Sequence, residues 1–210
     1  MQQEGQGASE AGGLGLAKIR EGFYKIVIER YAEAINAGEE KTIPELKALV
    51  NPLDASVQAL RQETVSKMDV GEYRFERDFL AYAERAFSAV QGLAKIHSEV
   101  SPSFWLAPRE MLLLGAADAF DRCILLCSLL IAGGSPAAKI RVLELEGGAR
   151  HPVVVFSHAE RQYLLDATQE SSALTHAGTL EEIFAQYTSG GRKVSKSAFE
   201  FNNEEYAEFD

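Results

Sequence analysis

Residues 115–134, GAADAFDRCILLCSLLIAGG, decide the fold class. Asp118 is a good helix N-cap, and the carboxylate of Asp121 in the first turn favours the open amides of a helix start. The residues that follow are apolar on nearly every side of a helix, which is typical of a helix that runs through a core. Gly133 and Gly134 supply the stop signal. We therefore predict a buried helix that begins at Ala119.

The chain upstream of this helix has helical periodicity, and the chain downstream alternates like strands. Apolar residues recur at helical spacing over residues 16–37 and 73–97, and TIPE, residues 42–45, is a capping box. Downstream, KIRVLELE, RHPVVVF and RQYLLDAT alternate as half-buried strands, with turns at GG, residues 147–148, and SHAE. The prediction is an α+β fold: a helical N-terminal half, then a core helix packed on an antiparallel β-sheet.

Composition suggests four segments along the chain. Residues 1–15 are rich in Gly, Gln, Glu and Ser and predict a flexible N-terminal tail, residues 16–100 a helical region, residues 101–200 the core that holds the buried helix and the sheet, and residues 201–210 an acidic, solvated C-terminal tail. Ordering such a tail costs about 1 kcal/mol or more per residue. If the N-terminal tail is ordered, we expect it to pack along the protein or to enter a cleft, its own or a neighbour's.

The net charge of −10 argues against nucleic acid and against an anionic membrane surface as the main partner. A local basic patch remains around Arg192, Lys193 and Lys196. The N-terminus lacks the basic start and apolar run of a secretory signal, and CILLCSLLIAGG is too short to span a bilayer. We expect a cytoplasmic protein. The sequence does not indicate its oligomeric state.

The two cysteines, Cys123 and Cys127, lie four residues apart on the expected core helix. Successive helix turns suit a disulfide poorly, and two cysteines without clustered histidines do not make a zinc site. We interpret both as small buried apolar residues and expect no metal.

Position 119 and two downstream residues have the properties of a nucleophilic site. The first turn of a buried helix stabilises a thiolate, so a cysteine at position 119 would be reactive. His151 lies in the second expected strand and Asp166 at the end of the third, and adjacent antiparallel strands can bring the carboxylate to the imidazole. Either residue alone is more simply structural; their order after such a helix start favours a site.

Residues 107–168 resemble the transglutaminase-like superfamily, relatives of papain-type cysteine peptidases that include peptide N-glycanases. APREMLLLGAADAFD runs in register with the family's lead-in and G-D-C motif, LLCSLLIAGG with its helix, RHPVVVF with its histidine strand and LLDAT with its aspartate strand. The resemblance places the family's catalytic cysteine at Ala119, its histidine at His151 and its aspartate at Asp166. Ala117, Pro152 and Ala167 depart from the family pattern without removing a catalytic group, whereas Ala119 removes the nucleophile.

The resemblance implies thiol acyl transfer on a peptide or protein amide, with no cofactor and no metal. A thiolate at position 119 would attack the carbonyl, with His151 as base and then acid and Asp166 holding its tautomer. Water is always available as acceptor, whereas an amine needs a second site, so hydrolysis is favoured slightly over transamidation. The backbone amide of residue 119 would contribute to an oxyanion hole, with Trp105 and Gln91 as candidate side-chain contributors.

Three explanations of Ala119 remain open. An engineered Cys-to-Ala change would leave the other site residues intact, as they are here. A natural pseudoenzyme would bind a peptide or protein without cutting it, but such a chain tends to lose His151 or Asp166 as well. A shifted alignment would make Cys123 the nucleophile, although burial raises a thiol's pKa and hides it.

Overall fold

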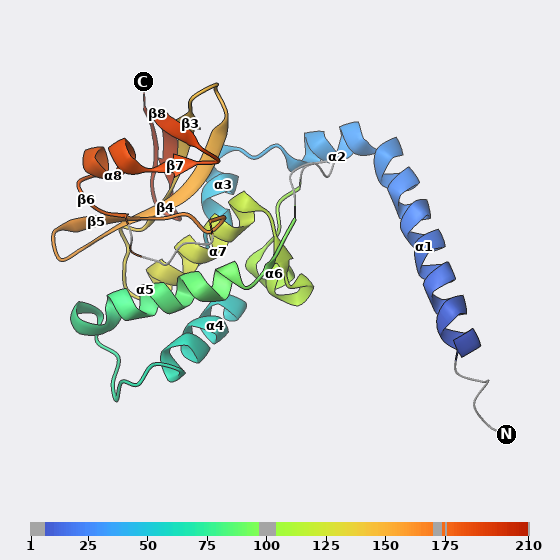
Figure 1. Cartoon of the computed structure of the whole chain (residues 1–210), viewed down its shortest axis with the longest axis horizontal. Helices are drawn as coiled ribbons and strands as arrows, with labels where there is room; N and C mark the ends of the chain where they lie inside the picture. Colours follow the sequence, from blue (N-terminus) through green and yellow to red (C-terminus); the bar gives the residue numbers. More distant parts are fainter. Residues whose placement is uncertain (1–6, 97–103, 170–173, 175, 210) are drawn as a thin grey trace. The chain divides into compact units, whose positions relative to one another are not determined.

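A computed structural model describes residues 7–96, 104–169, 174 and 176–209, with side chains from residue 16 onward. The chain divides into two compact units (Figure 1). The N-terminal unit comprises residues 1–40 and 98–104, and the main unit comprises residues 41–97 and 105–210. The helices between residues 41 and 97 therefore belong to the same compact unit as the sheet.

The described part of the N-terminal unit is helical. Helix α1 (Gly7–Arg30) and helix α2 (Ala32–Glu39) meet at Tyr31. Helix α1 begins earlier than the helix expected from Leu16, so residue 15 is not an element boundary. Residues 1–6, to which part of the tail prediction refers, lie outside the described residues.

The described part of the main unit has six helices, and most of them begin at recognisable local signals. They are α3 (Ile43–Leu49), α4 (Ala55–Ser66), α5 (Phe75–Gln91), α6 (Pro108–Leu114), α7 (Ala119–Ala132) and α8 (Leu180–Gln186). Thr42 with Glu45 and Thr179 with Glu182 form capping boxes, as predicted. Asp118 caps α7 by accepting a hydrogen bond of 2.8 Å from the Asp121 amide. No described helix has the length and apolarity needed to cross a membrane.

The predicted antiparallel sheet is present and wider than expected. Its path runs β6-β5-β4-β3-β8-β7, and β9 also pairs with β8. The strands are β3 (Lys139–Leu145), β4 (Arg150–His158), β5 (Arg161–Leu165), β6 (His176–Gly178), β7 (Thr188–Ser189), β8 (Arg192–Phe201) and β9 (Tyr206–Glu208). Strands β1 (Ala94–Lys95) and β2 (Ala116–Ala117) form a separate parallel pair. Strand β2 precedes α7 in the chain, so the pair holds the segment after α5 beside the segment that leads into α7.

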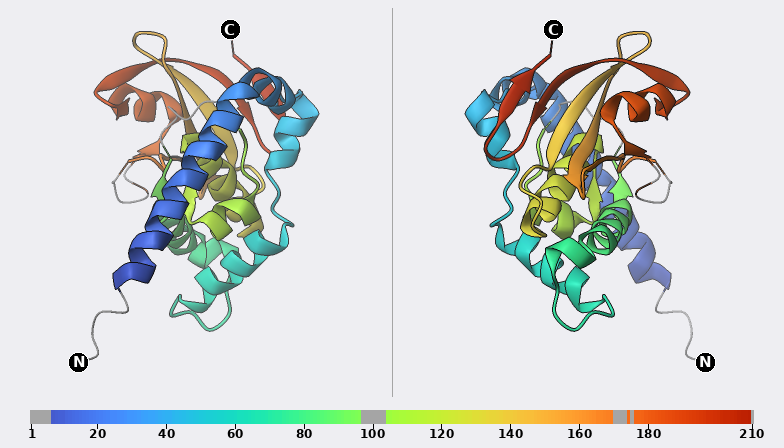
Figure 2. Two further views of the ribbon diagram at one scale, coloured as in Figure 1. Left: turned by 90° about the vertical axis from the view of Figure 1, so that its right-hand side faces the viewer. Right: turned by 90° about the vertical axis from the view of Figure 1, so that its left-hand side faces the viewer.

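The two faces of the sheet bury different helices (Figures 1 and 2). One face packs on α7, with Ile140, Val154 and Leu165 in the main core. The other face carries α8, and its smaller core includes Leu143, Val153, Leu164, Ile183 and Tyr187. The alternation of apolar side chains along each strand supplies both cores, because successive residues point to opposite faces.

The stop of α7 depends on two glycines, as predicted. A Cβ at Gly133 would lie 2.2 Å from a ring carbon of Tyr82, so no larger residue fits there. Gly134 has φ +110°, a conformation that side chains disfavour. The pair ends the helix and turns the chain toward β3.

The acidic residues of the predicted C-terminal tail, Glu204, Glu205 and Glu208, are exposed as expected, but the segment is held to the main unit rather than free. Phe201 is fully buried, and the side-chain amide Nδ2 of Asn202 donates to the carbonyl oxygens of Pro136 and Ala138 at 3.2 Å each. Strand β9 then pairs with β8. The acidic composition of this segment gave no sign of a strand, although Glu205 is paired with Lys139.

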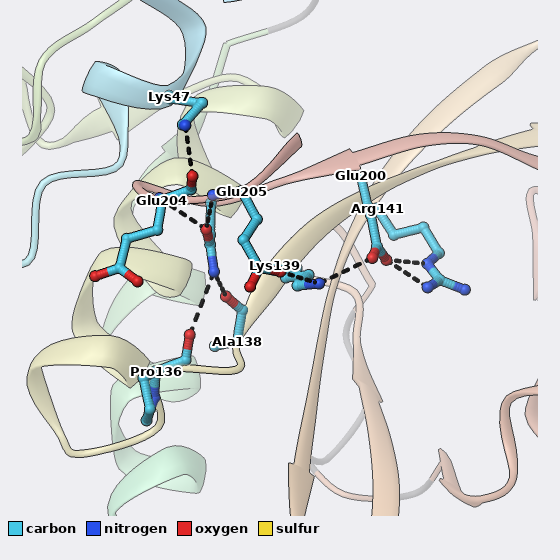
Figure 3. A network of polar contacts seen from close by, with 9 residues as sticks. Lys47, Pro136, Ala138, Lys139, Arg141, Glu200, Glu204 and Glu205 are labelled. Carbon is cyan, nitrogen blue, oxygen red and sulfur yellow. Dashed lines mark hydrogen bonds and ion pairs between the residues drawn. The ribbon is translucent and has the colours of Figure 1, made fainter. Parts of the chain in front are cut away.

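The cations near this segment come from other elements of the main unit (Figure 3). Lys139 Nζ lies 3.1 Å from Glu200 Oε1 and 2.7 Å from Glu205 Oε2. Arg141 pairs with Glu200, and Lys47 donates to the backbone oxygen of Glu204. The network joins the C-terminal segment to β3 and α3.

Candidate functional site

The strand pairing brings His151 and Asp166 together. His151 lies near the start of β4, and Asp166 directly follows β5, which pairs with β4 in antiparallel register. His151 Nε2 lies 2.9 Å from Asp166 Oδ2. The side chain of His151 is 14% exposed and that of Asp166 is 2% exposed, so the pair presents the imidazole and hides the carboxylate. The predicted contact between the two side chains is confirmed.

Asp166 receives three further hydrogen bonds. The hydroxyl of Tyr187 donates to Oδ2 at 2.6 Å, and the Thr168 amide and hydroxyl donate to Oδ1 at 2.9 and 2.7 Å. Burial by itself would raise the pKa of Asp166, but the contacts with His151, Tyr187 and Thr168 outweigh it and lower the pKa to about 2. Asp166 is therefore a carboxylate at neutral pH.

The ionised Asp166 fixes the proton on the imidazole. A carboxylate only accepts hydrogen bonds, so His151 Nε2 must carry the hydrogen in this contact. The neutral ring then has its lone pair on Nδ1. That nitrogen is the one left to exchange a proton with a reacting group.

Ala119 is the first residue of α7 and is half-buried. Cys123 lies one turn further along the same face of the helix. The thiol of Cys123 is fully buried, and its pKa is raised well above the ordinary value, first by burial and then by the negative charge of Asp166. Cys123 therefore lies close enough to Asp166 to be affected by its charge, and residue 119 lies one turn earlier on the same helix.

A second buried carboxyl group lies in the first turn of α7. Asp121 is 2% exposed, and its Oδ1 accepts a hydrogen bond of 3.1 Å from the Leu106 amide. Burial and the neighbouring charge of Asp118 raise the pKa of Asp121 to about 7. This bond ties the segment around Leu106 to the helix start. Trp105 lies on that segment and packs edge-on against Phe120, with ring centroids 5.6 Å apart.

Gln91 lies beside the loop that carries Asp166. It is the last residue of α5, and its Nε2 donates to the Gln169 carbonyl at 2.6 Å. Of the two candidate oxyanion contributors, Trp105 thus lies next to the residue that follows Ala119, and Gln91 has one amide N–H occupied by the Asp166 loop.

Sequence reasoning missed Tyr187, Thr168 and Arg122. The contact of Tyr187 with Asp166 depends on how α8 packs on the sheet, and no spacing in the sequence signals it. Thr168 stands two residues after Asp166, where a hydroxyl commonly closes a local turn. Arg122 is the one cation in the apolar helix α7. A single cation in such a helix indicates a residue with a specific buried partner, so the sequence could have singled it out.

Within the described residues, no group of three or more His, Cys, Asp or Glu side chains is arranged to hold a metal ion. Cys123 and Cys127 are both free and buried. The prediction that these cysteines are buried apolar residues is confirmed.

No family model and no curated protein matches the chain. Among solved structures, LapG from Legionella pneumophila is similar at 16% identity and TM-score 0.49, with 72% of this chain and 85% of that chain covered. Its calcium-bound form gives 15% identity and TM-score 0.45, with 73% and 90% covered. A candidate cysteine protease from Cytophaga hutchinsonii is 14% identical, with TM-score 0.37 and coverages of 73% and 48%.

Proposed function

We propose that the main unit is the scaffold of a transglutaminase-like thiol acyl-transfer enzyme whose nucleophile position, residue 119, holds alanine. The observation that carries the proposal is the His151–Asp166 pair, with a carboxylate held ionised by four hydrogen bonds. Such an arrangement orients an imidazole for proton transfer. Cys123, one turn after residue 119 on the same helix face, is affected by the charge of Asp166, which supports a place for residue 119 on that side of α7.

The proposed reaction needs a cysteine at position 119. Helix amides and the helix dipole favour a thiolate there. The thiolate attacks an amide carbonyl of a peptide or protein, and His151 takes up the thiol proton and later gives it to the leaving amine. Asp166 keeps the Nε2–H tautomer. Water then hydrolyses the acyl-enzyme, and an amine in its place would give transamidation.

Cys123 is a poor alternative nucleophile. It is fully buried, and burial together with the charge of Asp166 holds its pKa well above the ordinary value. A thiol in this position stays protonated and inaccessible. The prediction that the Ala119 Cβ points at the imidazole stays a prediction, supported by the helix face that residues 119 and 123 share.

The second candidate function is a natural module that binds a peptide or protein at the same site without cutting it. The alanine itself favours this alternative, because the chain as it stands has no nucleophile at position 119. The intact His151–Asp166 pair favours an engineered Cys-to-Ala change in an enzyme instead. The codon at position 119 of the natural gene separates the two.

The cytoplasmic location also stays a prediction.

The test restores the nucleophile. Ala119→Cys should give hydrolysis of members of a mixed peptide library, measured by mass spectrometry, and Ala119→Cys combined with His151→Ala should abolish it. The parent chain serves as the inactive control. Cleavage or amine transfer that survives loss of His151 would contradict the mechanism. Peptides that bind the parent and the Ala119→Cys variant equally, with no product from either, would favour the binding module.

A further inference from the structure

We propose that Arg122 is a positioning residue for the His151–Asp166 pair, which it controls by holding the backbone of the loop after β5. The relevance of this inference to catalysis rests on the proposed function, whereas the contact of Arg122 with the loop after β5 does not depend on any reaction.

Arg122 is a buried cation in an apolar helix. It is 4% exposed, Nη1 donates to the Ala167 carbonyl at 2.9 Å and Nη2 donates to the Leu93 carbonyl. Among the described residues no carboxylate pairs with it, and its Nε has no hydrogen-bond partner. Burial lowers its pKa. Burying a cation is costly, and here the guanidinium obtains in return only contacts with backbone oxygens.

One of those oxygens belongs to the peptide group that binds Asp166. The Ala167 carbonyl accepts from Arg122, and the amide at the other end of the same peptide, that of Thr168, donates to Asp166 Oδ1 at 2.9 Å. A peptide group is planar and rigid. Fixing its oxygen therefore fixes the direction of its N–H, and Arg122 sets the orientation of the Asp166 carboxylate through a single peptide.

The same loop is held at the next two carbonyls by donors from other elements. Lys95 in β1 donates to the Thr168 carbonyl, and Gln91 in α5 donates to the Gln169 carbonyl. Arg122 is the buried member of these three donors. Its second bond, to Leu93, joins the loop to the segment that precedes β1. We therefore expect Arg122 to be the contact on which the orientation of the loop depends most.

Loss of Arg122 should release the imidazole. When the Ala167–Thr168 peptide can rotate, Oδ1 loses its amide donor and the carboxylate turns. The bond from Oδ2 to His151 then weakens, and the ring populates both neutral tautomers instead of the Nε2–H form alone.

The experiment reads the tautomer of His151 by long-range proton–nitrogen NMR. Spectra are taken at roughly pH 8.5, where ordinary imidazoles are neutral, and the signals are assigned with His151→Gln. The parent should show the Nε2–H tautomer and a slowly exchanging downfield Nε2–H proton. Arg122→Met should lose the downfield signal and show mixed nitrogen shifts. An unchanged tautomer and an unchanged downfield signal would overturn the inference.

Ser128→Ala is the matched control. Ser128 is buried on the same helix and donates to the Ile124 carbonyl, so its loss perturbs α7 without touching the Asp166 loop. It should leave the His151 signals as in the parent. Where Arg122→Met does not fold, Arg122→Lys carries the test. The ammonium group of the introduced lysine can replace only part of the contact with the Ala167 and Leu93 carbonyls. Exchange of the His151 Nε2–H proton should therefore become faster, and an unchanged exchange rate would overturn the inference.

A second readout separates this inference from the proposed function. In the Ala119→Cys background, Arg122→Met should slow alkylation of residue 119 by roughly tenfold to a hundredfold, the cost of a small misplacement of reacting groups. If residue 119 is unreactive even with Arg122 present but the tautomer still depends on Arg122, the positioning role stands and the proposed function fails. If residue 119 is reactive and Arg122→Met changes neither the rate nor the spectrum, the positioning role alone fails.

Discussion

Asp166 and Asp121 are two buried carboxyl groups of the main unit whose pKa values move in opposite directions. As whole residues, Asp166 is 3% exposed and has a pKa of about 2, and Asp121 is 2% exposed and has a pKa of about 7. Burial by itself would raise the pKa of both carboxyl groups. Asp166 accepts four hydrogen bonds, one of them from a histidine, whereas the carboxyl group of Asp121 accepts from the backbone amides of Leu106 and Asp118 and lies near the negative charge of Asp118.

The difference shows that donors, not depth, decide the charge of a buried acid. The loop after β5 gathers donors from α8, β4 and its own backbone around Asp166, which makes a permanent anion. The backbone donors of Asp121 lower its pKa less than burial and the charge of Asp118 raise it. The site therefore holds one acid that orients an imidazole and another that titrates near neutral pH.

The largest expected effect is the loss of the Asp166 carboxylate. Asp166→Ala leaves the Tyr187 hydroxyl and the Thr168 amide without their acceptor, so we expect a loss of about 3–5 kcal/mol in the free energy of unfolding. Urea unfolding at pH 7 measures it. Asp166→Asn keeps an acceptor oxygen and should lose less. Equal small losses in both variants would mean that the donors around Asp166 contribute little.

The next effect concerns Asp121 and depends on pH. Its folded pKa of about 7 lies above the ordinary value of 3.8, so the native state binds more protons than the unfolded state between these pH values. Stability is then lost as pH rises from 4 to 7, by up to about 4 kcal/mol for a shift of about three units. Asp121→Asn should remove this loss, stabilising the protein at pH 8 and leaving it unchanged at pH 4. If the free energies of unfolding of the parent and of Asp121→Asn change in parallel between pH 4 and pH 8, then the pKa of Asp121 is not raised.

A smaller effect is expected from Tyr187→Phe. Removing one donor to the Asp166 carboxylate should cost about 1.5–3 kcal/mol at pH 7 and move the pKa of Asp166 up toward its ordinary value. Because the lowered pKa contributes stability that is lost as pH falls from 4 to 2, the difference between variant and parent should shrink in acid. Tyr206→Phe, whose hydroxyl donates to the exposed Glu208, is the control and should change stability by less than about 0.5 kcal/mol. Equal losses in the two variants would contradict the special role of Tyr187.

The parts of the site that could be predicted from sequence are those set by local signals and strand order. Asp118 as cap, the apolar run and Gly133–Gly134 fix α7, because each acts within a turn of its own position. The contact between His151 and Asp166 follows from the order of two strands joined by a tight turn. These features need no knowledge of distant packing.

The rest depends on packing that no local pattern records. Strand β8 pairs with β3 about fifty residues earlier in the chain, and its first residues, Arg192 and Lys193, are exposed, so the segment suggested a basic patch rather than a strand. Tyr187 reaches Asp166 only because α8 folds back on the sheet. The C-terminal strand was concealed by acidic residues whose partners, such as Lys139, lie far away in sequence.

The central claim is that residue 119 is the nucleophile position beside the His151–Asp166 pair, and alkylation of Ala119→Cys tests it most directly. The protein is treated with iodoacetamide at pH 7, and labelling of residue 119, Cys123 and Cys127 is followed by peptide mass spectrometry. We predict that residue 119 labels much faster than either buried cysteine and that His151→Ala slows its labelling. Labelling of residue 119 no faster than Cys123 would contradict the claim and leave α7 as a core helix without a catalytic position.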